Sequence, residues 1–251
     1  MSAKILCDFD GTITHRDVTD GLLERFALPE WRLVEEDYLG GRIGSRECML
    51  RQVDLIRADP SEIDRFLDQE EIDPFFPEFV QFCKDTGLQL QIVSDGMDYA
   101  IKRILGRHGL DHLPIVTNHL EILGNRRFRL QFPHANDGCS RGSGTCKCAM
   151  AKPAQQALPW LFQHPEEDGG AWRTILIGDG TSDYCVASTV DLVFAKNKLL
   201  EYCRRTDVCY RVYRDFADIC SMMEGMYKIG RMPIPDHFKS DESASTWEDF
   251  F

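Results

Sequence analysis

Short apolar runs alternate along the chain with stretches whose apolar positions recur three and four residues apart. The run KILCDF stands near the start, and LQLQIVS, TILIG, LVFA and CYRVY follow later. Each is typical of a buried strand that leads into a helix. Repeated strand–helix units predict crossover connections and a mainly parallel sheet with helices on both faces. We therefore expect an α/β fold with a Rossmann-like core.

The segment 17–73 departs from this alternation. Its apolar residues keep helical spacing around Leu22 and again around Val53, and Gly40-Gly41 and Asp59-Pro60 divide it into separate helices. The segment is too long for a simple crossover. We expect a helical cap inserted after the first strand.

Residues 113–132 read as extended chain, and the Gly124-Asn125 pair predicts the turn of a β-hairpin insertion. The Gly-, Ser- and Cys-rich segment up to 148 reads as a loop, and a helix is expected over 152–163. The catalytic core then comprises 1–16 and 74–232, with the hairpin and loop at 113–148 inserted in it. The polar, acidic segment 233–251 is expected to be a disordered tail.

Composition and charge narrow the classes of function. The hydrophobic fraction of 43% and charged fraction of 28% are ordinary for a globular protein, and the net charge of -12 argues against a nucleic-acid-binding protein. No apolar run reaches the ~20 residues that cross a bilayer. The N-terminal MSAKILCDFD lacks the features of a secretory signal, so we expect a cytoplasmic protein whose ten cysteines are reduced.

Polar residues follow three of the predicted strands. Asp8 and Asp10 end the first strand and point the same way, Ser94 ends LQLQIVS, and Asp179 and Asp183 follow TILI. Parallel sheets gather functional groups at the carboxyl ends of their strands. Crowded carboxylates repel unless a cation relieves them, and magnesium prefers such oxygen ligands. Taken singly, each feature is explained equally well by a helix cap or a solvated strand end.

Lys152 precedes Pro153 at the start of the helix expected over 152–163. Alone it reads as a solvated charge, but beside a phosphate it would offset developing negative charge. The order DFDGTIT, Ser94, Lys152 and GDGTSD resembles the haloacid dehalogenase superfamily of phosphotransferases. The resemblance implies that Asp8 attacks phosphorus and forms a covalent intermediate. It also implies that Asp10 protonates the leaving alcohol and then deprotonates water, which favours phosphate ester hydrolysis.

The same resemblance implies a magnesium site. Asp8, Asp179 and the backbone carbonyl of Asp10 would coordinate the ion, and Asp183 would support both the metal and the lysine. Ser94 and Lys152 would hold the transferring phosphoryl group, a role in which loop N–H groups at Gly96 could assist. Alignment and charge neutralisation supply most of the acceleration in phosphoryl transfer.

The cap resembles that of the phosphoserine phosphatase branch. Within that branch, several segments are similar to the 2-hydroxy-3-keto-5-methylthiopentenyl-1-phosphate phosphatases of methionine salvage: CDFDGTIT with Asp17, Pro29-Glu30-Trp31, SDGMDY, the PHANDGCSRGSGTCKC loop, IGDGTSDYCVAS and FAKNKLLEYC. This resemblance implies a small phosphorylated metabolite as substrate, with no nucleic acid or membrane partner.

Three positions leave the substrate open. Asp95 stands where that family has a glycine, which resembles the phosphoethanolamine and phosphocholine phosphatases; it either contacts a cationic head group or caps the next helix. Asp17 either contacts the substrate or caps the first cap helix. The place of a phosphoserine-binding arginine holds Leu50, with Arg51 adjacent. Met49 and Leu50 either wall the pocket or pack inside the cap.

His134, Cys139, Cys146 and Cys148 could form a structural zinc site, because sulfur and imidazole ligands favour tetrahedral zinc. A catalytically inactive relative that serves as a binding or regulatory protein is a further hypothesis. It has little support, since every expected catalytic position holds a competent residue. Another hypothesis is a phosphotransferase that passes the phosphoryl group to an acceptor other than water.

Overall fold

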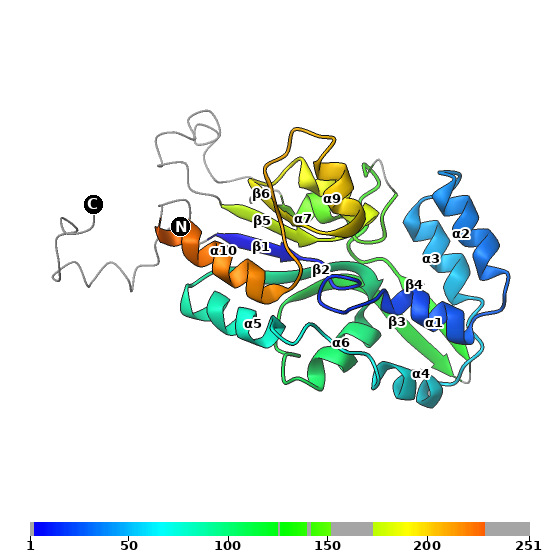
Figure 1. The fold of residues 1–251 in the computed structure, drawn as a ribbon. Coiled ribbons are helices and arrows are strands. Elements are labelled where there is room, and N and C mark those ends of the chain that lie inside the picture. The colour runs from blue at the N-terminus through cyan, green and yellow to red at the C-terminus, as the bar shows by residue number, and fades with distance from the viewer. Residues whose placement is uncertain (1–2, 125, 140–141, 152–172, 229–251) are drawn as a thin grey trace, which may run out of the picture.

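The computed structural model describes residues 3–124, 126–139, 142–151 and 173–228. Its centre is a seven-stranded sheet with the order β4-β3-β2-β1-β5-β6-β7 (Figure 1). The central strand β1 (Lys4–Cys7) is flanked on one side by β2 (Gln89–Met97), β3 (Ile115–Gly124) and β4 (Arg127–Gln131), and on the other by β5 (Thr174–Gly178), β6 (Leu192–Ala195) and β7 (Tyr210–Val212). All neighbouring strands are parallel except β3 and β4. The predicted α/β fold is confirmed.

Helices cover both faces of the sheet because alternate residues of its strands are apolar on both sides. Ile5 belongs to a core with α5 (Phe76–Asp85), α6 (Asp98–Gly106) and α10 (Phe216–Lys228), whereas Leu6 belongs to a core with α7 (Lys147–Ala151), α8 (Tyr184–Ala187) and α9 (Asn197–Cys203). Near-continuous apolar runs such as the fully buried β6 are what a doubly covered parallel sheet requires.

Four helices form the cap between β1 and α5: α1 (Val18–Phe26), α2 (Trp31–Leu39), α3 (Ser45–Val53) and α4 (Pro60–Leu67). They lie together at one end of the sheet (Figure 1). Local sequence sets their ends. The Asp17 side chain accepts a hydrogen bond from the Asp20 N–H at the start of α1, and Asp59 and Glu62 form a capping box before α4. The predicted helical cap is confirmed.

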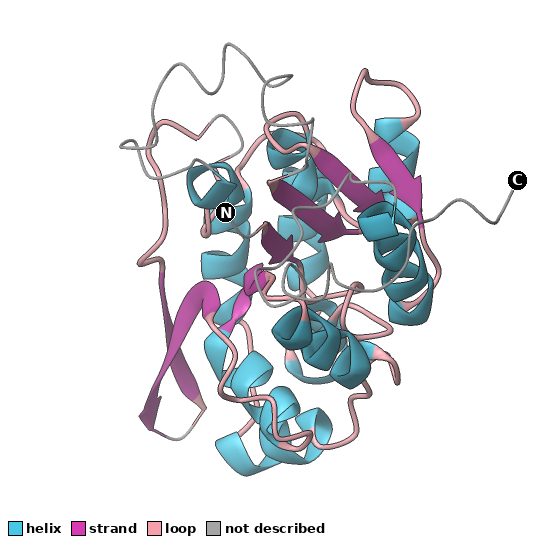
Figure 2. Ribbon diagram, turned by 90° about the vertical axis from the view of Figure 1, so that its left-hand side faces the viewer, coloured by secondary structure: helices cyan, strands magenta, loops and turns pink. Residues whose placement is uncertain are grey.

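The predicted hairpin is also confirmed. β3 pairs with β2 through its first residues and then with β4, with His119 opposite Gln131. Gly124 turns the chain with φ +127, a conformation that favours glycine. The hairpin projects from the sheet beside the cap helices (Figure 2).

The remaining predictions on local structure have different outcomes. The helix after the Cys-rich loop begins at Lys147, inside the segment that was expected to be loop. The helix expected over 152–163 and the tail 233–251 lie outside the described residues. All ten cysteines lie within the described residues, and their expected reduced state stays a prediction. In the part of the chain that the structure describes, no helix combines the length and apolar character needed to span a membrane.

Candidate active site

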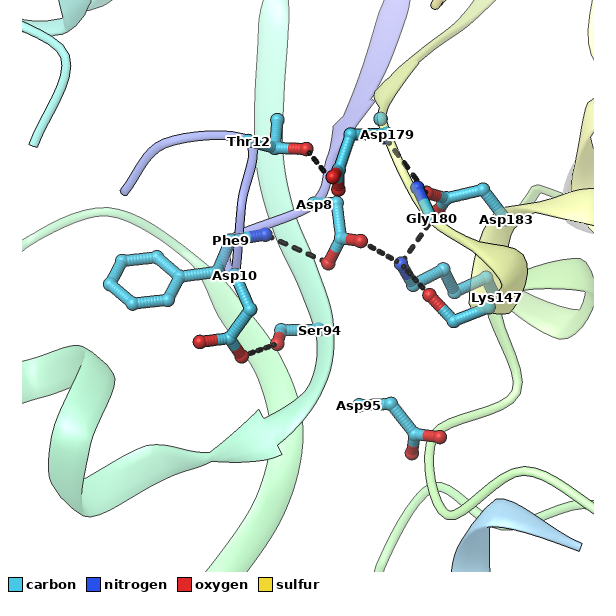
Figure 3. Close-up of polar contacts among 12 residues, drawn as sticks. Asp8, Phe9, Asp10, Thr12, Ser94, Asp95, Lys147, Asp179, Gly180 and Asp183 are labelled. Carbon is cyan, nitrogen blue, oxygen red and sulfur yellow. Dashed lines mark hydrogen bonds and ion pairs between the residues drawn. The ribbon is translucent and has the colours of Figure 1, made fainter. Parts of the chain in front are cut away.

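Asp8 directly follows β1 and lies at the centre of the site (Figure 3). Its Oδ1 accepts a hydrogen bond from the Phe9 N–H at 2.8 Å, and its Oδ2 lies 2.8 Å from Lys147 Nζ. The residue is only 5% exposed. Burial raises the pKa of this carboxyl well above its ordinary value, although the Lys147 ammonium opposes that shift. The site therefore holds a buried, oriented carboxyl group beside a cation.

Lys147 is the first residue of α7 and is 2% exposed. Its ammonium also contacts Asp183 Oδ1 at 2.6 Å and donates to Ser182 Oγ at 3.1 Å. Burial lowers the pKa of this lysine, but the two carboxylates outweigh burial and hold the pKa above its ordinary value. Lys147 is thus a fixed positive charge against Asp8.

Two further acids stand on the turn after β5. The fully buried Asp183 accepts hydrogen bonds at 3.3 Å from the N–H groups of both Asp179 and Gly180. Asp179 accepts from the Thr12 hydroxyl and from the Asn197 amide, each at 3.2 Å. Burial raises the pKa of Asp179, with Asn197 opposing the rise. Asp183 shapes the turn and anchors Lys147, while Asp179 lies beside Asp8 (Figure 3).

Asp10 lies on the side of the site nearest the cap. Its Oδ1 accepts a hydrogen bond from the Val18 N–H at 2.9 Å, and its Oδ2 lies 3.5 Å from Ser94 Oγ. Burial raises the pKa of Asp10 well above its ordinary value, and the nearby Asp17 adds to the rise. A Cβ at Gly96 would lie 3.0 Å from Ser94 Oγ and closer still to Asp10 Oδ2, so only glycine fits there without displacement. The neighbouring strands β1 and β2 thus bring Asp10, just after β1, close to Ser94 on β2.

The acid cluster suits a hard divalent cation. Asp8, Asp179 and Asp183 each offer an oxygen, and these atoms lie within 4.8 Å of one another. An all-oxygen donor set on rigid backbone fits magnesium. Asp8 and Asp179 line a cleft of about 510 Å³, whose lining also includes Tyr38 and Met49 from the cap.

The structure changes the assignment of the lysine. Lys147 occupies the place beside Asp8 that was expected for Lys152, and Lys152 lies outside the described residues. Sequence reasoning missed Lys147 because the CKC context drew attention to its neighbours as zinc ligands. The sequence did contain a signal: two lysines, Lys147 and Lys152, lie five residues apart near the expected start of the helix.

Some of the cap residues singled out from the sequence line the cleft, and others lie on the protein surface. Met49 is buried and lines the cleft, while Leu50 is 44% exposed and does not line it. Arg51 pairs with Glu47 on the surface of α3. Asp17 lines the cleft and also caps α1, so both of its anticipated contacts remain compatible.

The expected zinc set is not assembled. Among the residues that the structure describes, the only group of three or more metal-binding side chains within reach of one ion is the aspartate cluster. The Cys139 thiol is directed to the Ser143 hydroxyl at 3.7 Å, and the buried Cys146 sulfur accepts from Asn136 Nδ2 at 3.8 Å. A hydrogen bond to Cys185 instead raises the pKa of Cys148. The prediction of zinc on His134, Cys139, Cys146 and Cys148 is therefore unsupported, because Cys139, Cys146 and Cys148 each contact a separate partner.

A capped, mainly parallel α/β sheet with clustered acids and one buried lysine at its strand ends defines a phosphoryl-transfer type of enzyme. The sequence profile of the haloacid dehalogenase-like hydrolases matches residues 5–188. The chain belongs to this family and is a phosphoric monoester hydrolase.

The relatives that it resembles share most of its length. A 2-hydroxy-3-keto-5-methylthiopentenyl-1-phosphate phosphatase of Exiguobacterium sp. is 31% identical over 230 residues, covering 90% of this chain and 99% of the relative. An enzyme of the same name from Geobacillus thermodenitrificans is 31% identical over 224 residues, covering 88% and 94%. A substrate-bound phosphoserine phosphatase has a similar fold, with a TM-score of 0.59, 19% identity and coverage of 88% and 98%.

Proposed function

We propose that this protein is a magnesium-dependent phosphatase that hydrolyses a small phosphomonoester through an aspartyl-phosphate on Asp8. The observation that carries the proposal is the contact of the Asp8 carboxylate with the Lys147 ammonium at 2.8 Å, at a cleft that Asp10 and Ser94 also line. The carboxylate is oriented, and the cation beside it can offset the charge of a phosphoryl group. This is the environment that an in-line attack on phosphorus needs.

In the first step an Asp8 oxygen forms a bond to phosphorus, and the bond from phosphorus to the alcohol oxygen breaks. Asp10, whose pKa burial raises, is suited to carry the proton that the alcohol oxygen takes as it leaves. Ser94 and Lys147 bind the oxygens of the phosphoryl group. In the second step Asp10, now a carboxylate, accepts a proton from water. The water oxygen bonds to phosphorus, phosphate leaves, and Asp8 is free again.

Asp8 and Asp179 would hold a magnesium ion, with the Asp10 backbone carbonyl as a further ligand. Asp183, whose oxygen lies within reach of the same cluster, would support the metal site and Lys147. When bound, the ion neutralises negative charge on the phosphoryl oxygens. The residues present fit this group, because their oxygens already lie within 4.8 Å of one another.

The substrate that we favour is 2-hydroxy-3-keto-5-methylthiopentenyl-1-phosphate. Two relatives with this activity in their names cover most of the chain, and Met49 gives the cap side of the cleft an apolar surface suited to a methylthio group. Phosphoserine is a poorer fit. The arginines of α3 are turned to surface acids, Arg51 to Glu47 and Arg46 to Asp137, so neither is directed at a substrate carboxylate.

An ester with a cationic head group, such as phosphoethanolamine, is the second candidate. Carboxylates of Asp17, Asp20 and Glu35 line the cap side of the cleft and favour a positive charge there. Burial and the adjacent Asp17 raise the pKa of Asp20 to about 7, a cost that a bound ammonium would relieve.

Release of phosphate from p-nitrophenyl phosphate tests the chemistry. Asp8→Asn and Asp10→Asn are expected to abolish it, while Asp85→Asn, on an exposed position of α5, is expected to retain it. A wild-type protein inactive with every divalent metal tried would refute the enzymatic mechanism and favour a binding role. Comparison of kcat/KM for the methylthio ester, phosphoethanolamine and phosphoserine then ranks the substrates.

A further inference from the structure

Asp95 follows Ser94 within β2, and its carboxylate receives hydrogen bonds from three separate parts of the chain. Oδ1 accepts from the Thr145 N–H at 2.8 Å and from Asn118 Nδ2 at 3.2 Å. Oδ2 accepts from the hydroxyl of Ser45, the first residue of α3. One side chain of the core thus contacts the cap, the hairpin strand β3 and the loop that precedes Lys147.

Buried polar groups reinforce this junction. Asn118 is fully buried, donates to the Asp95 carbonyl at 2.7 Å, and accepts from the Thr145 hydroxyl at 3.1 Å. A Cβ on Gly144 would lie 2.7 Å from Asn118 Oδ1 and 2.9 Å from Asp95 Oδ1, so the loop backbone is in close contact with both. Satisfied polar networks of this kind fix one arrangement, because each broken bond leaves a buried group unpaired.

The cap contacts the same loop a second time. The Arg46 N–H at the start of α3 donates to the Gly142 carbonyl at 3.1 Å. The loop therefore runs from the cap, past Asp95 and Thr145, to Lys147 two residues later. Where Thr145 is held determines where α7 begins and where the Lys147 ammonium lies relative to Asp8.

We propose that Asp95 is a positioning residue that couples cap helix α3 to the lysine-bearing loop, so that the position of α3 on the core and the placement of Lys147 against Asp8 depend on one carboxylate. The proposal rests on the proposed function in that it gives Lys147 a role in phosphoryl transfer. It also gives Asp95 a different role from the contact with a cationic substrate that the sequence suggested. Three protein donors already compensate its charge, and an ammonium group would have to displace them.

Three variants separate these roles. In Asp95→Ala all three hydrogen bonds are lost. In Asp95→Asn the amide oxygen can still accept from Thr145 and Asn118, while the amide nitrogen can donate to the Ser45 hydroxyl. Ser45→Ala removes only the link to α3.

The kinetic readout is hydrolysis of p-nitrophenyl phosphate, which has no ammonium group. Because a displacement of about 1 Å can cost about 10²-fold in rate, we expect Asp95→Ala to lower kcat by about that factor with little change in KM. Asp95→Asn should restore most of kcat, and Ser45→Ala should lower it less than Asp95→Ala does. Hydrogen exchange of peptides covering 142–151, measured without substrate, should be faster in Asp95→Ala and in Ser45→Ala than in wild type.

Several outcomes overturn the proposal. If Asp95→Ala leaves kcat for p-nitrophenyl phosphate unchanged and raises KM only for phosphoethanolamine, Asp95 is a substrate contact. If Asp95→Asn is as impaired as Asp95→Ala, negative charge and not the hydrogen-bond pattern is what matters. Should Asp95→Ala fail to fold, unchanged exchange in Ser45→Ala refutes the coupling. An inactive wild-type protein would refute the proposed function alone, since the exchange measurement needs no turnover.

Discussion

Lys147→Met removes the cation that lies between two buried carboxylates and keeps much of the length of the side chain. Lys147 Nζ is 2.8 Å from Asp8 Oδ2 and 2.6 Å from Asp183 Oδ1. Loss of one partner from a buried ion pair costs about 3–5 kcal/mol in unfolding free energy, because the remaining charge is left uncompensated. Both carboxylates belong to residues at most 5% exposed, so solvent screens their remaining charges only weakly.

The catalytic effect of Lys147→Met is separate from its effect on stability. A fixed donor that stabilises transition-state charge contributes about 10²–10³-fold to kcat. Asp183→Asn in the same chain removes one of the uncompensated charges, and its amide oxygen can still accept from the N–H groups of Asp179 and Gly180. We expect the double variant to regain stability without regaining activity.

Thermal unfolding and p-nitrophenyl phosphate hydrolysis measure the two effects side by side. The matched control is Lys152→Met, which is expected to keep near wild-type kcat because Lys147 already occupies the place beside Asp8. If Lys152→Met abolishes activity while Lys147→Met retains it, the assignment of the catalytic lysine to Lys147 is wrong.

Other predictions concern sterics, metal and pH. Gly178→Ala would bring a Cβ against Asp183 Oδ2 and is expected to lower kcat strongly, whereas Gly180→Ala meets no atom within 4 Å and should be tolerated; equal losses would contradict this. Chelation should abolish phosphate release and magnesium should restore it, with a gain in stability of about 2.7 kcal/mol at a hundred times Kd, visible as a higher Tm. Although burial opposes it, a hydrogen bond from His119 helps to hold the pKa of Asp98 below its ordinary value. The contribution of Asp98 to stability is therefore fully present at a pH above the pKa of Asp98 in the unfolded chain. It is lost as the pH falls through the lower pKa of Asp98 in the folded protein. The Tm difference between wild type and Asp98→Ala should thus shrink between pH 6 and pH 3.

The sheet and its acids could be predicted from sequence because both depend on local patterns. The apolar runs that became β1, β2 and β5 were long enough to mark buried strands. Asp8 and Asp179 stand just beyond the carboxyl ends of β1 and β5, and Ser94 lies in the last half of β2. The topology of a parallel sheet brings such positions together without any knowledge of side-chain contacts.

The course of the 133–147 loop could not be predicted in this way. Its path depends on contacts with Asp95 and Asn118, which are distant in sequence, and on the close approach of Gly144 to both. Composition alone marked the segment as irregular and rich in cysteine, which suggested zinc. The loop instead brings Lys147 into contact with Asp8, and no periodic sequence pattern predicts that contact.

The acids of the site look alike in sequence, and their surroundings distinguish them. Asp183 receives two backbone N–H groups and the Lys147 ammonium, and Asp95 receives three donors, so both have their acceptor capacity largely used within the protein. Asp8 and Asp10 each hold one short backbone N–H contact on one oxygen. Their second oxygens each face a single side-chain donor, the ammonium of Lys147 on Asp8 and a hydroxyl at 3.5 Å on Asp10. A carboxylate that must form a bond to phosphorus or exchange a proton needs an oxygen that its partners can release. The saturated acids therefore position the site, and the unsaturated pair is left for the chemistry.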